Sequence, residues 1–144
     1  MVPASAPEFQ VTFDCADPHA QARWWAALLG YEVPDTHEFV TALLESGVLP
    51  PDDAVEVEGR RAFRDATAAV DPTGGRPRLY VQLVPQAKSA MNRLHLDVRT
   101  RAEDLEAEVE RVVALGASFV EFNHQGDHRW AVMRDPEGNE FCLT

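Results

Sequence analysis

The residues with the clearest chemical potential lie on short segments that alternate polar and apolar side chains. In RLHLDV, His95 and Asp97 are two positions apart and would therefore share one face of a strand. Gln10 and Thr12 share a face of the segment EFQVTFDC in the same way. An imidazole titrates near neutral pH, and a neighbouring carboxylate can orient it. We therefore take His95 and Asp97 as the candidate catalytic acid–base residues.

Two further alternating segments, LYVQL and EFCLT, add polar groups to this face. Tyr80 and Gln82 oppose the apolar positions of the first segment, and Cys142 opposes those of the second. The two halves of the sequence match Gln10 with His95 and Gln82 with Cys142, so we predict that these four groups face one common hollow. The candidate ligand-binding residues are Gln10, Thr12, Tyr80, Gln82, Trp130 and Cys142.

The same pattern also has a purely structural explanation. Polar residues at alternate strand positions occur wherever one face of a sheet meets water. Aromatic residues beside strands usually belong to the core, which applies to Trp130 as well as to Trp24 and Trp25. His124 and His128 fall in the predicted hairpin turn NHQGDH, where exposed histidines are expected. The sequence leaves both interpretations open.

A strand and a capped helix position the first pair of polar residues. The segment EFQVTFDC alternates as a half-buried strand does. Asp17 is a suitable N-cap, with Pro18 at the first helical position, and Gly30 is a suitable stop after Leu29. A buried stripe of this helix should include Ala22, Trp25 and Leu29.

The second half repeats this order. The strand RLHLDV is followed by Thr100 and Glu103, which have the spacing of a capping box, and the helix then ends at Gly116. Gly30 follows Gln10 by 20 residues, and Gly116 follows His95 by 21. Such a recurrence indicates an internal duplication.

Each half then ends in strands. The second helix is followed by the strand segments ASFVEF, RWAVMR and EFCLT, and the first half ends with FRDATAAV and LYVQLV. The turn motif DPTG of the first half corresponds to DPEG of the second. The sequence thus predicts an α+β fold of two βαβββ modules, at about 8–85 and 92–144, joined by a linker at 85–92 in a single domain over 1–144. An insertion near 35–62 contains a short helix through Ser46, and PPDDAVEVEGRR is predicted to be a loop.

Composition excludes several classes of partner. The 144 residues include 24 acidic and 13 basic ones, for a net charge of −11, so nucleic acid and anionic lipid are not expected partners. No apolar run is long enough for a membrane helix, and the opening MVPASAPE has neither a basic start nor an apolar stretch. We expect a cytoplasmic protein whose Cys15 and Cys142 are free thiols.

These features together resemble the vicinal oxygen chelate superfamily, the group of glyoxalases, bleomycin-resistance proteins and dioxygenases. WWAALLGYEV after the first strand and DPEGNEFCL at the end carry the resemblance. RLYVQLVPQAKSAMNRLHLDV and WAVMRDPEGNEFCL resemble its glyoxalase-like domain subgroup in particular. The resemblance runs from about Phe9 to Leu143. It implies that the modules form a cupped, partly open mixed sheet with the helices outside, often in homodimers.

The resemblance also implies a place for a divalent metal. In metal-using members each half supplies ligands from its first and last strands, and these places hold Gln10, Gln82, His95 and Cys142 here. His95 fits the family pattern, whereas Gln82 and Cys142 stand where carboxylates are usual. Neutral amides and a protonated thiol supply no fixed negative charge, so Ni, Fe or Mn would be held weakly, while Zn could still use His95 and Cys142.

Three functions follow as hypotheses. The first is a protein that binds a small organic molecule in the cup without a metal cofactor, as bleomycin-resistance proteins do. The second is an enzyme, a lyase, isomerase or dioxygenase, that uses His95, oriented by Asp97 or Gln82, with or without a metal. The third is a purely structural or interaction module with no small ligand.

Overall fold

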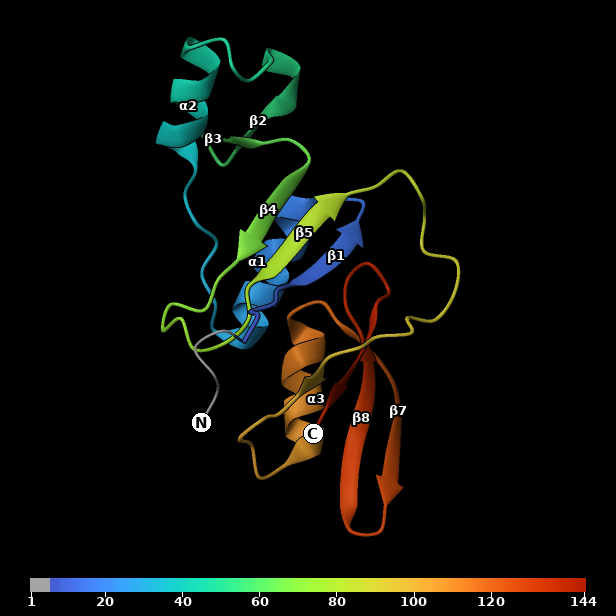
Figure 1. The fold of residues 1–144 in the computed structure, drawn as a ribbon. Coiled ribbons are helices and arrows are strands. Elements are labelled where there is room, and N and C mark those ends of the chain that lie inside the picture. Colours follow the sequence, from blue (N-terminus) through green and yellow to red (C-terminus); the bar gives the residue numbers. More distant parts are fainter. Residues whose placement is uncertain (1–5) are drawn as a thin grey trace. The chain divides into compact units, whose positions relative to one another are not determined.

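The computed structural model describes residues 6–144, which form two compact units (Figure 1). Unit 1 ends at Pro85, and unit 2 begins at Gln86. Residues 1–5, part of the opening segment for which the sequence predicts no secretion signal, lie outside the described part. Within residues 6–144, no helix is long and apolar enough to span a membrane.

Unit 1 is built on a three-stranded sheet in the order β1-β5-β4. Its strands are β1 (Val11–Cys15), β4 (Ala66–Ala69) and β5 (Leu79–Leu83). β1 pairs with β5 in parallel, and β4 pairs with β5 antiparallel. Parallel neighbours need a crossover connection, and the helix α1 (Pro18–Leu29) begins that connection.

Helix α1 has the bounds and caps that the sequence predicts. The Asp17 side chain accepts a hydrogen bond of 3.0 Å from the backbone N–H of Ala20. Gly30 ends the helix with φ 66°, a left-handed conformation that glycine adopts without a Cβ clash. Both ends therefore satisfy backbone groups that a helix leaves unpaired.

The core of unit 1 lies between α1 and one face of this sheet. Trp25 is 1% exposed, and its ring stacks on Phe13 of β1 with the ring centroids 5.3 Å apart. Ala22, Cys15 and Val81 are buried in the same core. The apolar face of the strands is thus covered by the helix, and the polar face of β1 and β5 points the other way.

The insertion in unit 1 is more ordered than predicted. It contains α2 (His37–Glu45), a short 3-10 helix η1 (Pro51–Asp53), and an antiparallel hairpin of β2 (Ala54–Val57) and β3 (Arg60–Phe63). The short helix was predicted, but the prediction of a loop for PPDDAVEVEGRR is wrong. A turn at Glu58 and Gly59, both with positive φ, closes the hairpin.

Unit 2 has a four-stranded sheet in the order β6-β9-β8-β7. Its elements in chain order are β6 (Asp97–Val98), α3 (Leu105–Ala114), β7 (Ser118–Gln125), β8 (His128–Arg134) and β9 (Glu140–Leu143). This is the predicted βαβββ order. Phe141, Met133 and Leu143 form part of its buried core.

Three local predictions for unit 2 are wrong. The strand RLHLDV is reduced to β6, although the backbone N–H of Cys142 still donates to the Leu96 carbonyl at 3.0 Å. Thr100 does not cap α3, because the helix begins only at Leu105 and the Thr100 hydroxyl instead accepts from the backbone N–H of Ala102 at 3.0 Å. The N-cap is Asp104, whose side chain accepts from the Ala107 N–H at 3.2 Å. The turn NHQGDH is largely strand, because β7 and β8 extend to either side of two central residues.

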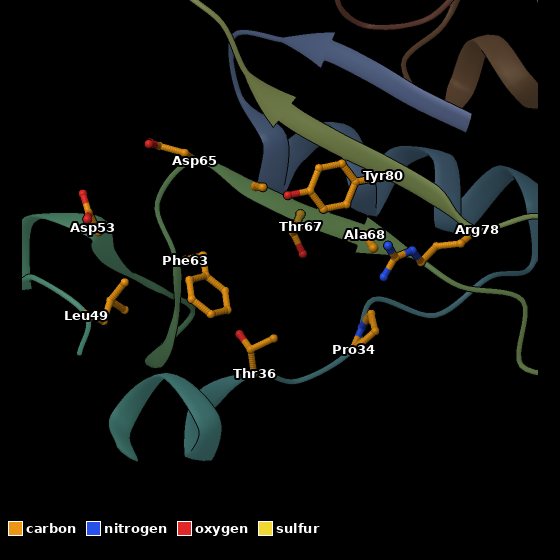
Figure 2. Close-up of a pocket in the computed structure, with 11 residues that line it drawn as sticks. Pro34, Thr36, Leu49, Asp53, Phe63, Asp65, Thr67, Ala68, Arg78 and Tyr80 are labelled. Carbon is orange, nitrogen blue, oxygen red and sulfur yellow. The ribbon is translucent and has the colours of Figure 1, made fainter. Parts of the chain in front are cut away.

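Both units follow the same plan. In unit 1 the strand that would match β7 is reduced to a single bridge between Glu32 and Val70, next to β4. The chain thus has the predicted α+β class, with open sheets of two βαβββ units, in which α1 covers one face of the unit 1 sheet and α3 contacts β7 and β8 of unit 2. The insertion follows Glu32 and lies on the side of unit 1 that carries the pocket described next (Figures 1 and 2).

Candidate functional site

A pocket of about 520 Å³ lies in unit 1, between the insertion and the polar face of the sheet (Figure 2). We call it the unit 1 pocket. Its insertion side includes Phe63, Leu49 and Thr36, and its sheet side includes Ala68 and Tyr80. The complete lining is Pro34, Thr36, Leu49, Asp53, Phe63, Asp65, Ala66, Thr67, Ala68, Arg78 and Tyr80.

Small residues on β4 make room for the pocket. Ala66 and Ala68 share the polar face of the sheet, and Ala68 pairs with Tyr80 across the β4–β5 ladder. A methyl group at each position leaves the Tyr80 ring exposed toward the insertion, as Figure 2 shows. The sheet therefore presents an aromatic ring beside an open floor, a surface suited to a flat organic group.

Arg78 supplies a positive charge at one end of the pocket. Its Nε donates a hydrogen bond of 2.9 Å to Oε1 of Gln10, and Nη2 donates to the same oxygen. Its guanidinium carbon lies 5.5 Å from the centroid of the Tyr80 ring, a cation–π contact. No carboxylate of the described residues forms an ion pair with Arg78.

Two carboxylates lie at the other end of the pocket. Figure 2 shows Asp53 and Asp65 on the side away from Arg78, with Phe63 and Tyr80 between the two ends. Asp53 ends η1, and its backbone carbonyl accepts from the N–H of Arg64 at 2.8 Å. The carbonyl of Asp65 accepts from the N–H of Leu83 at 2.7 Å. The backbone of both residues is thus fixed, and the pocket has charges of opposite sign at its ends.

Gln82 lies on the same strand face but not in the lining of the pocket. Its amide Nε2 donates a hydrogen bond of 2.8 Å to Oδ1 of Asp14, the residue that it opposes in the β1–β5 ladder. Thr12 opposes Tyr80 in that ladder and is exposed. Of the residues predicted in this half, Tyr80 lines the pocket, and Gln10 reaches it through Arg78.

Unit 2 gathers three further candidate residues. His95, Asp97 and Cys142 each offer one ligand atom, and these atoms lie within 4.8 Å of one another. Nδ1 of His95 is 3.2 Å from Oδ1 of Asp97, and Asp97 pairs with Cys142 in the β6–β9 ladder. We call these residues the unit 2 cluster. The predicted orientation of His95 by Asp97 is compatible with this geometry.

Cys142 in this cluster is a weak acid. Burial raises the pKa of its thiol, and the nearby Asp97 carboxylate raises it further by repelling the thiolate and by accepting a hydrogen bond from the thiol. The group therefore stays protonated at neutral pH and is not an activated nucleophile. Both cysteines are free thiols, as predicted.

The sheet registers revise the matching of the two halves. Asp71 and Asp135 begin equivalent turns, and the residues three positions before them, Ala68 and Val132, pair with Tyr80 and Cys142 respectively. Tyr80 rather than Gln82 is thus the counterpart of Cys142. The predicted match of Gln82 with Cys142 came from the order of residues in the last strands of the two halves. It is wrong because the turn after Asp71 is two residues longer than the turn after Asp135.

In the same registers Tyr80 faces Thr12 and Cys142 faces Asp97. Gln10 lies two residues before Thr12, as His95 lies two residues before Asp97. The match of Gln10 with His95 is therefore consistent with the registers.

The unit 1 positions do not fit a metal ion. The Gln10 oxygen, the donor expected there, already accepts two hydrogen bonds from the guanidinium of Arg78. That positive charge would repel a divalent cation at the same oxygen. The unit 2 cluster offers imidazole, carboxylate and thiol, a donor set that suits a thiophilic ion such as Zn better than Mn or Mg. A four-ligand site drawn from both halves stays a prediction.

The remaining predicted residues take varied roles. The Trp130 ring stacks on His128 with centroids 5.5 Å apart, near the end of the β7–β8 hairpin. Trp24 and Trp25 are buried in the core of unit 1, which agrees with their structural interpretation. Sequence reasoning missed Arg78, although its place two residues before Tyr80 on an alternating strand puts it on the polar face.

Comparisons with known proteins agree with this fold. The profile of a family described as "glyoxalase-like domain" matches residues 10–144. A search of curated proteins found no match. Among solved structures, a glyoxalase/bleomycin resistance protein/dioxygenase family enzyme from Burkholderia phytofirmans PsJN is 14% identical, with a TM-score of 0.62 over 93% of this chain and 94% of that chain.

Two other neighbours have named activities. The fosfomycin resistance protein FosX from Listeria monocytogenes is 12% identical, with a TM-score of 0.58 over 96% of this chain and 91% of that chain. The oxidase ChaP-H2 is 18% identical, with a TM-score of 0.57 over 96% and 92%. One FosX structure contains Mn(II) with dihydroxypropylphosphonic acid. At these identities the likeness shows the fold alone.

Proposed function

Because the chain belongs to the glyoxalase-like domain family, we propose that it binds a small organic molecule in the unit 1 pocket, without a metal ion as the anchor. The observation that carries this proposal is the pocket itself, about 520 Å³ in volume with an aromatic wall and one arginine. Pockets for small ligands and cofactors have volumes of roughly 300–1,000 Å³ and combine apolar walls with a few polar anchors.

The lining supplies both parts of such a site. Phe63, Leu49 and Pro34 provide apolar surface, and the Tyr80 ring provides a face for stacking. Arg78 provides directional hydrogen bonds and a charge that Gln10 holds in place. The guanidinium of Arg78 would thus anchor the oxygen atoms of a ligand without a metal ion.

A screen of small fragments by NMR tests the proposal. We expect several aromatic fragments to shift backbone signals of Ala66, Thr67 and Tyr80. Ala68→Leu places a larger side chain on the floor of the pocket and should abolish these shifts. The matched control is Ala27→Leu, which makes the same change at an exposed position of α1 and should leave them intact.

Two results would overturn the proposal. One is a screen in which no fragment shifts the pocket signals. The other is a set of fragments that bind Ala68→Leu as tightly as the parent protein. Thermal unfolding of both variants shows whether a loss of binding comes from a loss of the fold.

The unit 2 cluster favours a second candidate function, an enzyme in which His95 transfers a proton. The 3.2 Å contact between His95 and Asp97 would fix the orientation of the imidazole, as a carboxylate does for many catalytic histidines. The test is incubation of the protein with the whole fragment library, whether or not a fragment binds the unit 1 pocket, followed by mass spectrometry. His95→Ala should abolish any conversion, and conversion that survives His95→Ala would rule this candidate out.

A further inference from the structure

On the basis of the proposed binding function, we infer that the unit 1 pocket selects a dipolar ligand. Such a ligand carries an anionic group at the Arg78 end, a cationic group at the Asp53 and Asp65 end, and an aromatic or apolar body between them. The argument rests on the charges at the two ends of the pocket and on the surface that separates them (Figure 2).

The anionic group is specified by the unused donors of Arg78. A guanidinium has five N–H donors in a planar fork, and Gln10 accepts from Nε and from Nη2. Three N–H groups therefore remain for a ligand. Because Gln10 is neutral and no ion pair of Arg78 exists among residues 6–144, the positive charge is also uncompensated. A carboxylate, sulfonate or phosphonate group satisfies both the donors and the charge.

The cationic group is specified by Asp53 and Asp65. Both residues are exposed at the rim of the pocket, and within the described part of the chain neither carboxylate has a side-chain partner. Hydrogen bonds fix the backbone of both residues, so the two negative charges stay at the same end of the pocket. An ammonium or guanidinium group of a ligand would be attracted there, and a second anionic group would be repelled.

The body of the ligand is specified by what lies between the charges. Phe63 and Tyr80 present aromatic rings from opposite walls of the pocket, and the small side chain of Ala68 leaves space between them (Figure 2). The Phe63 ring is held by an edge contact with Phe39, with centroids 6.0 Å apart. A flat ring of a ligand can therefore lie between two aromatic side chains.

The overall charge explains why a simple anion is a poor ligand. The pocket has one positive and two negative side chains at its ends, and the whole chain has a net charge of −11. A simple anion would meet Arg78 but also an unfavourable potential from the rest of the protein. A molecule with separated charges gains at both ends of the pocket.

Isothermal titration with matched probes tests the inference. The dipolar probes are 4-(aminomethyl)benzoate and 4-(2-aminoethyl)benzoate, and phenylalanine carries both charges at one end. The singly charged probes are 4-methylbenzoate and 4-methylbenzylamine. We expect at least one separated dipolar probe to bind about tenfold or more tightly than the other three compounds, the gain typical of a charged hydrogen-bonding contact.

Two variants test which end of the unit 1 pocket binds which charged group of the probe. Arg78→Gln should weaken the dipolar probe and 4-methylbenzoate at least about tenfold and leave 4-methylbenzylamine unchanged. The double variant Asp53→Asn and Asp65→Asn should reduce the dipolar probe to the affinity of 4-methylbenzoate. The controls are Arg23→Gln on α1 and Glu56→Gln on β2, which change exposed charges outside the pocket.

The outcomes separate this inference from the proposed function. If 4-methylbenzoate binds as tightly as both dipolar probes, or if the double aspartate variant leaves the dipolar probe unaffected, the inference is wrong. If no probe binds although neutral fragments shift the pocket signals, the inference fails and the proposed function stands. If neither probes nor fragments bind, both fail.

Discussion

Arg76 donates two parallel hydrogen bonds to the buried carboxylate of Asp71, from Nε to Oδ2 and from Nη2 to Oδ1, each 3.2 Å long. Asp71 is 2% exposed, and its carboxylate also accepts hydrogen bonds from the backbone N–H and the hydroxyl of Thr73, at 3.1 and 2.8 Å. Nη1 of Arg76 donates to the Leu29 carbonyl at the end of α1. The ion pair of Asp71 and Arg76 therefore connects the turn between β4 and β5 to the end of α1.

This pair should make stability depend on pH in the acid range. The hydrogen bonds from Arg76 hold the pKa of Asp71 well below its usual range. In the unfolded chain an aspartate has a pKa of about 3.9. A depressed folded pKa means that its stabilising contribution is fully present above about pH 4 and is lost as the pH falls toward the folded pKa.

We expect Asp71→Asn to lower the urea midpoint at pH 7 and to flatten the loss of stability between about pH 5 and 2. The neutral amide keeps the shape but loses the charge and one acceptor. The control is Asp52→Asn, an exposed residue of η1, which should change neither quantity. Equal acid slopes in the parent protein and Asp71→Asn would contradict this account.

The turn at Glu58 and Gly59, which closes the β2–β3 hairpin, yields a prediction about stability. Glu58 has φ 50°, the only positive φ of a residue other than glycine in the part of the chain that the structure describes. Asparagine adopts this conformation more readily, so Glu58→Asn should raise the free energy of unfolding by roughly 0.5–1 kcal/mol. Gly59→Ala, at φ 76°, should lower it by roughly 1–2 kcal/mol.

Urea unfolding at neutral pH measures both changes. Because Glu58 is replaced by a neutral residue, Glu56→Gln on the neighbouring strand controls for the loss of charge. If Glu58→Asn instead has a lower free energy of unfolding than the parent protein, the Glu58 side chain makes a stabilising contact that outweighs the strain of its backbone.

The same turn explains one limit of the sequence prediction. The dipeptides Asn-Gly and Asp-Gly predict a hairpin turn with positive φ at both central residues, whereas Glu-Gly does not. The segment PPDDAVEVEGRR therefore lacks the turn signal and is predicted to be a loop, although Val55 and Val57 alternate with Glu56 as they would in a strand. By contrast, Asp17, Pro18 and Gly30 are strong local signals for the ends of a helix, and they predict the observed bounds of α1.

The candidate site was harder to predict than the fold. Alternation correctly placed Tyr80 on the polar face, because strand periodicity fixes faces without knowledge of the neighbours. It could not reveal the pocket, since the pocket depends on how the insertion packs near Ala68 and Tyr80. It also could not show that Arg78 occupies the Gln10 oxygen, because that contact joins residues 68 positions apart.

Cys142 should react slowly with thiol reagents. Burial and the Asp97 carboxylate raise its pKa, so little thiolate is present at pH 8. Asp97→Asn removes the repulsion, which should shift the pH profile of labelling by iodoacetamide to lower pH and speed labelling at pH 8. Mass spectrometry of peptides separates Cys142 from Cys15, which is 4% exposed and should stay unlabelled in the folded protein. A profile unchanged by Asp97→Asn would contradict the assigned cause.

The unit 2 cluster should discriminate among metals. Imidazole and thiolate prefer Zn(II) and Co(II) over Mn(II) and Mg(II), so we expect Co(II) to give a thiolate charge-transfer band in the near ultraviolet and Mn(II) to bind far more weakly. Cys142→Ser should abolish the band, and His95→Ala should weaken Co(II) binding at least about tenfold, in line with the loss of one ligand.

Cys15→Ala is the matched control for this titration, because it removes a thiol from the core of unit 1 and should leave the band unchanged. Competition by Zn(II) gives the affinity, which we expect to fall short of that of closed four-ligand sites, because the cluster offers three donors. Equal affinities for Mn(II) and Co(II), or a band that survives in Cys142→Ser, would show that the cluster does not act as a thiophilic site.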